Sequence, residues 1–266
     1  MPNRLAVLLL LTTSPLLAQT RFDGTWMMKM DTLQFSGTPE EYLVDQGLYR
    51  CLSCVPPVDV KSDGSDQKVA GHDAYYDTMS ARILDEKSVE FIFKKNGKVV
   101  ARSSETVSPD GKTMLEEFTN TADPDPVIGK AGFIRVGDAP TGAHALSGKW
   151  QMRTIKNATE AGTLTTYRSI PGGLKILNGR QSYDVKFDGK DYPIAGDRHA
   201  TVSLKLIDDF TVEEVDKNDG KILTIIRMSV SQDGKTMKVE SRQAAGRHHD
   251  LHSRKNSVAV LFALCG

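Results

Sequence analysis

Ser108-Pro109-Asp110-Gly111-Lys112-Thr113-Met114 returns 123 residues further along the chain as Ser231-Gln232-Asp233-Gly234-Lys235-Thr236-Met237. The two stretches are identical at six of seven positions. Further matches keep the same order, such as Gly24-Thr25-Trp26 with Gly148-Lys149-Trp150 and Val89-Glu90 with Val212-Glu213. Because the repeated unit is as long as a domain, the pattern predicts two sister domains and not a solenoid of short repeats.

The repeat divides the chain into parts with different expected roles. They are a signal peptide (residues 1–18), the first repeat (22–138), a linker (139–146), the second repeat (147–256) and an atypical tail (257–266). The first repeat is two residues longer within His72–Asp77, where the offset between the repeats changes. The linker is polar and contains Pro140 and Gly142, as expected of a connection between domains.

The first eighteen residues have the pattern of a secretory signal. Arg4 supplies the positive charge, Leu5–Leu11 the short apolar core, and Ala18 a small residue before a cleavage at Gln19. The apolar run is shorter than the roughly 20 residues that a transmembrane helix needs. We therefore expect export to the periplasm or the cell exterior, and not an integral membrane protein.

The charge of the chain is balanced, with 34 Lys and Arg against 34 Asp and Glu. Positive and negative residues are interleaved, and no basic stripe is present, which argues against nucleic acid as a partner. The sequence has no Ser/His/Asp arrangement, Gly-rich phosphate loop or HExxH motif. We therefore expect no catalytic residues, no cofactor and no resident metal, and the oligomeric state stays open.

Turn signals predict an all-β fold. Asn96-Gly97, Asp110-Gly111 and Asp219-Gly220 lie between runs rich in β-branched and aromatic residues, as in tight hairpins. The first repeat should contain four consecutive strands, at Thr78–Leu84, Ser88–Lys94, Lys98–Ser108 and Lys112–Thr119. Since closure removes the open edges of such a meander, we expect two tandem antiparallel β-barrels of roughly eight strands each.

The Gly-x-Trp at the head of each repeat resembles the start of a lipocalin-type barrel. That resemblance implies that Trp26 and Trp150 close one end of each barrel, and that Arg135 from a late strand packs on the Trp of the first repeat. Longer strings, at 188–196 and 201–205, are similar to a family of secreted bacterial proteins that are usually left without a function. This second resemblance covers most of the second repeat and the core of the first, and implies a barrel and export but no catalytic residues.

Cys51-Leu52-Ser53-Cys54 is the one motif with a chemical signature. A CxxC pair can be a redox disulfide, half of a metal site, a structural disulfide or two free thiols. Pro56-Pro57 follows the pair and disfavours the helix N-terminus that redox motifs use, and no second CxxC completes a zinc site. For an exported protein we favour a disulfide that braces a loop.

Two further groups of residues are candidates for a site. The longer loop of the first repeat concentrates His72, Tyr75 and Tyr76, which would form the rim of a ligand pocket or anchor the loop. Paired acids such as Glu116-Glu117 lie on predicted strands, so neighbours face opposite sides and cannot act on one substrate.

The end of the chain departs from the repeat. Residues 247–254 are rich in His and Arg. Residues 248–255 can be encoded so that reading one nucleotide later gives Thr-Thr-Thr-Phe-Thr-Ala-Glu-Lys, a good β-strand. A frameshift would explain residues 257–266 as an atypical tail in place of the last strand. Resequencing the 3′ end of the gene tests this hypothesis.

Three functions remain open at this point. The first is a non-enzymatic exported barrel protein that binds a small apolar or amphipathic ligand. The second is a structural or envelope-associated protein whose barrels are filled by side chains, and the third is a CxxC thiol-disulfide oxidoreductase. Because residues shared by both repeats are explained by folding, any activity should be sought where the repeats differ.

Overall fold

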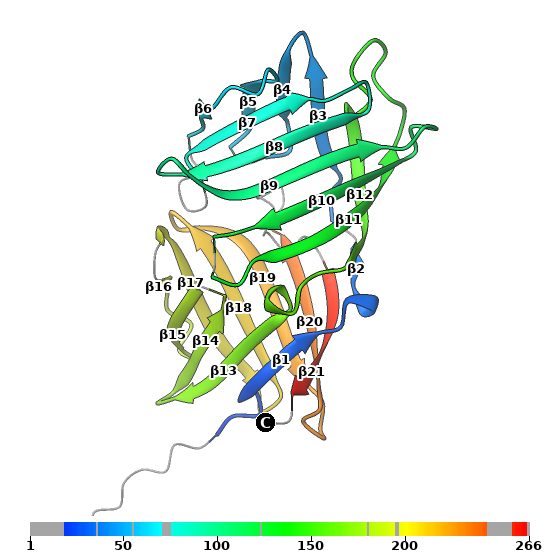
Figure 1. Ribbon diagram of the computed structural model, residues 1–266. Helices are drawn as coiled ribbons and strands as arrows, with labels where there is room; N and C mark the ends of the chain where they lie inside the picture. Colours follow the sequence, from blue (N-terminus) through cyan, green and yellow to red (C-terminus); the bar gives the residue numbers. More distant parts are fainter. Residues whose placement is uncertain are drawn as a thin grey trace, which may run out of the picture.

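The regular secondary structure of the described residues is almost entirely β-strand. A computed structural model describes residues 19–35, 37–54, 56–70, 76–122, 124–179, 181–194, 197–243 and 257–264 (Figure 1). Within these ranges the helices are two single turns, η1 (Met30–Thr32) and η2 (Glu160–Gly162). Neither is long and apolar enough to cross a membrane. The predicted signal peptide lies outside the described residues.

The described strands form two antiparallel sheets. The first, the ten-stranded sheet, has the order β5-β4-β3-β12-β11-β10-β9-β8-β7-β6. Its strands are β3 (Glu40–Asp45), β4 (Leu48–Cys51), β5 (Val58–Lys61), β6 (Gln67–Lys68), β7 (Thr78–Ile83), β8 (Ser88–Lys95), β9 (Lys98–Val107), β10 (Thr113–Asn120), β11 (Val127–Val136) and β12 (Gly148–Lys156).

The second, the eleven-stranded sheet, has the order β15-β14-β13-β1-β21-β20-β19-β18-β17-β16, with β2 also paired to β21. Its strands are β1 (Gly24–Met28), β2 (Gln34–Phe35), β13 (Leu164–Ile170), β14 (Gly173–Asn178), β15 (Gln181–Lys186), β16 (Tyr192–Ile194), β17 (Asp197–Asp208), β18 (Thr211–Asn218), β19 (Lys221–Val230), β20 (Thr236–Gln243) and β21 (Ser257–Leu264).

The four strands predicted in the first repeat are confirmed as β7 to β10, with ends that differ by at most one residue. Local turn chemistry explains this success. Asn96 and Gly97 have φ angles of 50° and 77°, and Asp219 and Gly220 have 47° and 73°. Two successive positive φ angles match the right-handed twist of a hairpin, and Asn, Asp and Gly adopt them most easily.

The first strand of each repeat lies in the sheet formed mainly by the other repeat. β12 pairs with β11 and β3, with Gly148 opposite Tyr42, whereas β1 pairs with β21 and β13, with Gly24 opposite Tyr167. Figure 1 shows the exchange, since β1 (blue) lies between β13 (green) and β21 (red). The ten-stranded sheet is therefore one continuous segment of chain inserted between β2 and β13.

The limits of the sheets consequently differ from the limits of the repeats. Residues 139–146, expected to link two domains, form a loop between β11 and β12, which are neighbours in one sheet. Leu146 in this loop is fully buried, and the ring of His144 lies 2.7 Å from the carbonyl oxygen of Asp85. The chain passes between the sheets after β2 and after β12 instead.

The number of strands is larger than the roughly eight expected for each unit. Residues 40–61 fold into three short strands, β3 to β5, and a turn at Gln46-Gly47 with φ angles of 52° and 75° allows the first hairpin. Gln46 is not a usual turn residue, so the sequence signal was weak. The ten-stranded sheet is nearly closed and barrel-like. Its first strand in the order, β5, leads directly to Gly64, whose amide donates to the carbonyl of Ala81 (2.8 Å) on β7, near the other end of the order.

The expected atypical tail supplies a strand. Residues 257–264 form β21 between β20 and β1, the place that β11 holds between β10 and β12. The His-rich stretch 247–254 lies outside the described residues. The frameshift hypothesis therefore stays a prediction, with resequencing as its test.

Candidate functional site

Two glutamates face each other across the inner face of the ten-stranded sheet. Glu105 on β9 alternates with the buried Ser103 and Val107, and Glu116 on β10 follows the buried Met114. Period-two alternation puts all of these side chains on the same face. The register makes Glu105 and Glu116 direct cross-strand partners, and their exposed fractions are only 6% and 4%.

The surroundings of this pair disfavour negative charge. Burial raises the pKa of Glu116 to about 7. Burial also raises the pKa of Glu105 well above its ordinary value, and the negative charge of Glu116 raises it further. Like charges directly opposite on a sheet repel, so the pair retains at least one proton at neutral pH.

The pair is also short of hydrogen bonds. Within the described part of the chain, Glu105 Oε2 and Glu116 Oε1 are buried and have no hydrogen-bond partner. Most buried polar atoms in proteins have one, and each exception calls for a physical explanation. These two acceptors are available to a donor that the chain does not supply.

Aromatic rings form the adjoining part of the interior. Tyr49 on β4 lies 4.7 Å from Phe91 on β8 and 5.9 Å from Tyr42 on β3, measured between ring centroids. The ring centroid of Phe93 lies 6.5 Å from that of Phe91 and 4.9 Å from that of Tyr76, in a T-shaped arrangement with Tyr76. All five rings are buried. Together these five residues line this part of the interior with aromatic rings, and we call them the aromatic wall.

The hydroxyls of Tyr42 and Tyr49 remain protonated. Burial raises the pKa of Tyr42 and of Tyr49 well above 10, and the negative charge of Glu105 is the next largest cause for each. The hydroxyl of Tyr42 donates to the carboxylate of Glu40. The tyrosines therefore act as neutral donors and not as bases.

The corresponding place in the eleven-stranded sheet is apolar. By the fixed offset between the repeats, Glu105 and Glu116 correspond to Met228 and Val239, which are also buried cross-strand partners. The same scaffold position thus folds around an apolar pair in one sheet and an acidic pair in the other. The acidic pair is not needed for this fold, which marks it as a candidate for function.

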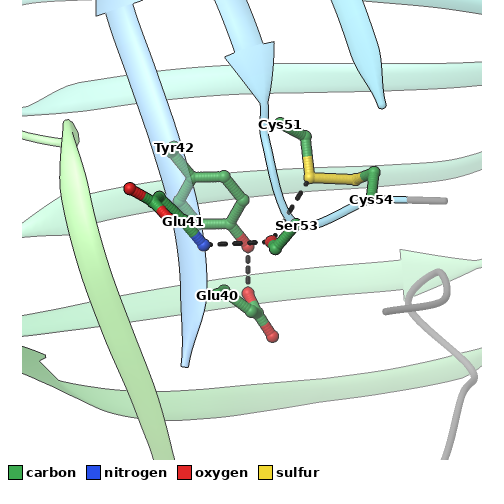
Figure 2. Close-up of a disulfide and its surroundings, with 6 residues drawn as sticks. All are labelled: Glu40, Glu41, Tyr42, Cys51, Ser53 and Cys54. Atoms are coloured by element: carbon green, nitrogen blue, oxygen red, sulfur yellow. Dashed lines mark hydrogen bonds between the residues drawn. A yellow bond between two sulfur atoms is a disulfide. The ribbon is translucent and has the colours of Figure 1, made fainter. Parts of the chain in front are cut away.

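The predicted disulfide is present. Cys51 and Cys54 are joined, with their Cα atoms 5.3 Å apart, and the bridge braces the turn between β4 and β5 (Figure 2). Between them, the hydroxyl of Ser53 accepts the amide N–H of Glu41 on β3 (2.9 Å). Cys51 is only 2% exposed and belongs to the core. The bridge thus fixes the strand edge beside Tyr42, which Figure 2 shows next to it.

The two tryptophans adopt equivalent positions in the two sheets. The indole N–H of Trp26 donates to the carbonyl of Phe22, and that of Trp150 donates to the carbonyl of Leu146, at 2.8 Å each. Both rings are buried. The guanidinium of Arg135 lies 4.0 Å above the ring of Trp150, and not over the Trp of its own repeat. Strand exchange is the reason, because it places β12 beside β11.

Arg135 also holds the loop that leads into β12. It donates to the backbone carbonyls of Gly111, Ala145 and Ser147, each at 2.6 Å. Burial lowers its pKa from the ordinary value. These contacts describe a structural role at the end of the ten-stranded sheet.

The remaining candidates divide between the core and the undescribed residues. Tyr76 is 6% exposed and packs in the core of the ten-stranded sheet, while His72 and Tyr75 lie outside the described residues. Glu116 and Glu117 face opposite sides as predicted, since Glu117 is exposed and pairs with Lys130. The pairing of Glu116 with Glu105 was missed. The signal for it was present, because two inward positions carry Glu where the second repeat carries Met228 and Val239.

The described residues contain no cluster of three or more His, Cys, Asp or Glu side chains that could hold a metal ion. No protein-family model, curated protein or solved structure matches this chain in comparisons with known proteins.

Proposed function

We propose that this protein is an exported, non-enzymatic protein of two tandem β-barrels, and that its ten-stranded barrel binds a small amphipathic ligand. The acidic pair Glu105–Glu116 carries the proposal. It is buried, lacks hydrogen-bond partners among the described residues, and replaces an apolar pair of the other sheet. Desolvating carboxyl groups in this way is unfavourable unless a partner compensates for it.

The dimensions of the sheet support an internal ligand. An eight-stranded barrel is just wide enough to be filled by side chains or to hold one small ligand, and the diameter grows with the number of strands. Ten strands line the proposed barrel. Small side chains also flank the acidic pair, with Ser103 two residues before Glu105 on the same face and Ala131 opposite Glu116. An apolar ligand body would lie against the aromatic wall, with its polar end toward the acids.

The second barrel fits a structural role. Its interior is packed with apolar side chains that include Leu204, Met228, Met237 and Val239. Its buried carboxyl group, Glu214, lies 3.4 Å from the hydroxyl of Tyr183. A filled barrel beside a binding barrel combines the first two functions considered from the sequence. The oxidoreductase is less favoured, because Cys51 is buried at the end of β4 and Cys54 lies in the turn that follows, without a helix start.

Filling the interior tests ligand binding. Ser103 corresponds to the buried Ile226 in the second repeat, so Ser103→Ile installs a residue that the scaffold accepts. We expect Nile red, a neutral apolar dye, to bind the native protein with increased fluorescence and to bind Ser103→Ile at least tenfold more weakly. Ser104→Ile, which is adjacent on β9 and faces the other side, is the matched control.

Native mass spectrometry of the exported protein gives a second measurement, since a retained small molecule would appear as added mass. Absence of both dye binding and added mass would overturn the proposal. Equal dye binding by the native protein and Ser103→Ile would place the dye elsewhere and would also contradict it.

A further inference from the structure

The acidic pair and the aromatic wall together define the kind of polar group that the site accepts. We infer that the ligand of the ten-stranded barrel is a small primary amine with an aromatic or apolar body, bound as its ammonium ion between Glu105 and Glu116. This inference rests on the proposed function and specifies the ligand class of that site.

The two unpaired carboxyl oxygens favour a ligand group that carries several hydrogen-bond donors. Glu105 Oε2 and Glu116 Oε1 are acceptors on directly opposed residues, and neither has a partner among the described residues. A primary ammonium group has three N–H donors and no acceptor, so one group can satisfy both carboxyl groups at once. Hydrogen bonds between ionised groups are about twice as strong as neutral ones. A neutral hydroxyl would satisfy the pair less well, and a carboxylate would be repelled.

The aromatic residues favour the same class. Tyr42, Tyr49 and Phe91 are buried, and the ring centroid of Tyr49 lies 5.9 Å from that of Tyr42 and 4.7 Å from that of Phe91. The charges of both glutamates act on the two tyrosines. Aromatic faces attract cations and also cover the apolar body of a ligand. No basic side chain of the described residues contributes to the pKa of either glutamate, so the pair lacks an internal counter-ion there.

A metal ion fits this site less well. Calcium takes six to eight oxygen ligands, and magnesium requires near-octahedral geometry. The described residues offer two glutamates at this position, and no described cluster reaches three His, Cys, Asp or Glu groups. A bulky organic cation needs fewer direct ligands, because the aromatic residues supply the rest of its surroundings.

Isothermal titration calorimetry with three probes of one shape tests the ligand class. They are 2-phenylethylamine, 2-phenylethanol and 3-phenylpropionate, which are cationic, neutral and anionic at pH 8. We expect the amine to bind at least tenfold more tightly than the alcohol, and the acid to bind most weakly. Equal affinities for amine and alcohol, or tighter binding of the acid, would overturn the inference.

The second repeat supplies the variant. Glu105→Met combined with Glu116→Val installs the pair that the eleven-stranded sheet already contains, so the fold should be retained and can be checked by circular dichroism. We expect this variant to lose its preference for the amine and still bind the alcohol. Glu105→Gln with Glu116→Gln keeps the side-chain shape and should behave in the same way. An unchanged preference for the amine in both variants would contradict the role of the pair.

Protonation gives an independent readout. Among the described residues, the titratable groups whose charges interact with Glu116 are Glu105 on β9 and the tyrosines Tyr42 and Tyr49, whose raised pKa values keep both hydroxyls neutral. Because the bound ammonium requires at least one ionised carboxyl group, and burial raises the pKa of Glu116 to about 7, the affinity for the amine should fall by about tenfold per pH unit below about pH 7. The affinity for the alcohol should stay constant. An amine affinity that does not change between pH 8 and pH 5 would refute the assignment.

The two proposals fail in different ways. If neither Nile red nor any of the three probes binds, the proposed function fails. If Nile red and 2-phenylethanol bind but the amine binds no more tightly, only the ligand class fails. Calcium chloride is the remaining probe. If calcium binds the native protein with measurable heat, and the double glutamine variant loses this heat, the site binds a metal ion and the amine assignment is wrong.

Discussion

Replacing Glu116 by glutamine should stabilise the protein at alkaline pH and leave it unchanged at mildly acidic pH. Glu116 is 4% exposed, and burial raises its pKa from 4.5 to about 7. A carboxyl group with a raised pKa binds its proton more tightly in the folded state than in the unfolded state. Its contribution to stability is therefore fully present below pH 4.5 and is lost as the pH rises through 7.

The size of the effect follows from this difference in pKa. Each pH unit corresponds to about 1.4 kcal/mol, so ionising Glu116 in the folded state costs about 3 kcal/mol. The glutamine side chain would carry an N–H donor where the protonated acid carries an O–H donor, but it cannot ionise. At pH 9 the variant should exceed the native free energy of unfolding by about 3 kcal/mol, or by roughly 6–12 °C in Tm for a protein of this size.

Urea denaturation followed by circular dichroism at pH 5, 7 and 9 measures the effect. This range avoids the exposed turn residues Asp110 and Asp233, whose pKa values are lowered by hydrogen bonds from Ser108 and Ser231 and which titrate at more acidic pH. Glu117→Gln, which removes an exposed ion pair with Lys130, should change the stability by less than about 1 kcal/mol at every pH. If Glu116→Gln and the native protein are equally stable at pH 9, the buried pair does not oppose ionisation and the reasoning is wrong.

Three further predictions concern the scaffold. Arg135→Lys should lower the free energy of unfolding by about 2 kcal/mol, because Lys cannot contact three carbonyls and a ring at once. The control Arg82→Lys, at an exposed position, should change it little. Equal losses of stability in urea unfolding would contradict this prediction. Reducing the disulfide between Cys51 and Cys54, which closes a short loop, should lower the free energy of unfolding by about 2 kcal/mol by the chain-entropy relation, as thermal melts can show. The native protein should not catalyse the reduction of insulin, and such catalysis would instead support the oxidoreductase. A fragment of residues 36–156, which contains all strands of the ten-stranded sheet, should unfold cooperatively and at a higher urea concentration than a fragment of residues 22–138, which lacks β12. Equal midpoints of urea unfolding would mean that β1 can replace β12 and would contradict this prediction.

Local signals in the sequence predicted much of the fold. Asn96-Gly97 and Asp219-Gly220 specify tight hairpins through their own φ preferences. The strands around Asn96-Gly97 were predicted to within one residue. Cys51 and Cys54 are three residues apart, and their bridge needed only a turn between neighbouring strands. Alternation also predicted correctly that Glu116 and Glu117 face opposite sides.

Only part of the candidate site could be predicted from such local signals. Alternation assigns Glu105 and Glu116 to a face of each strand, and the hairpin between β9 and β10 brings them together. The alternation does not show whether that face is buried or exposed. A pair of acids that faces outward would be solvated and would fit the same sequence pattern. The aromatic wall is further from prediction, because Tyr42, Tyr49 and Phe91 meet only when β3, β4 and β8 line one interior.

The sequence by itself determined the repeated hairpins, the alternation of faces and the local disulfide. Tertiary structure alone decided which sheet each Gly-x-Trp strand joins, and hence that Arg135 stacks on Trp150. The physical reason is that β1 and β12 begin with the same pattern and present equivalent pairing edges, with Gly24 and Gly148 both opposite a buried Tyr. Local propensity cannot distinguish two such strands, so the choice depends on chain connections and long-range packing, which exist only in the folded protein.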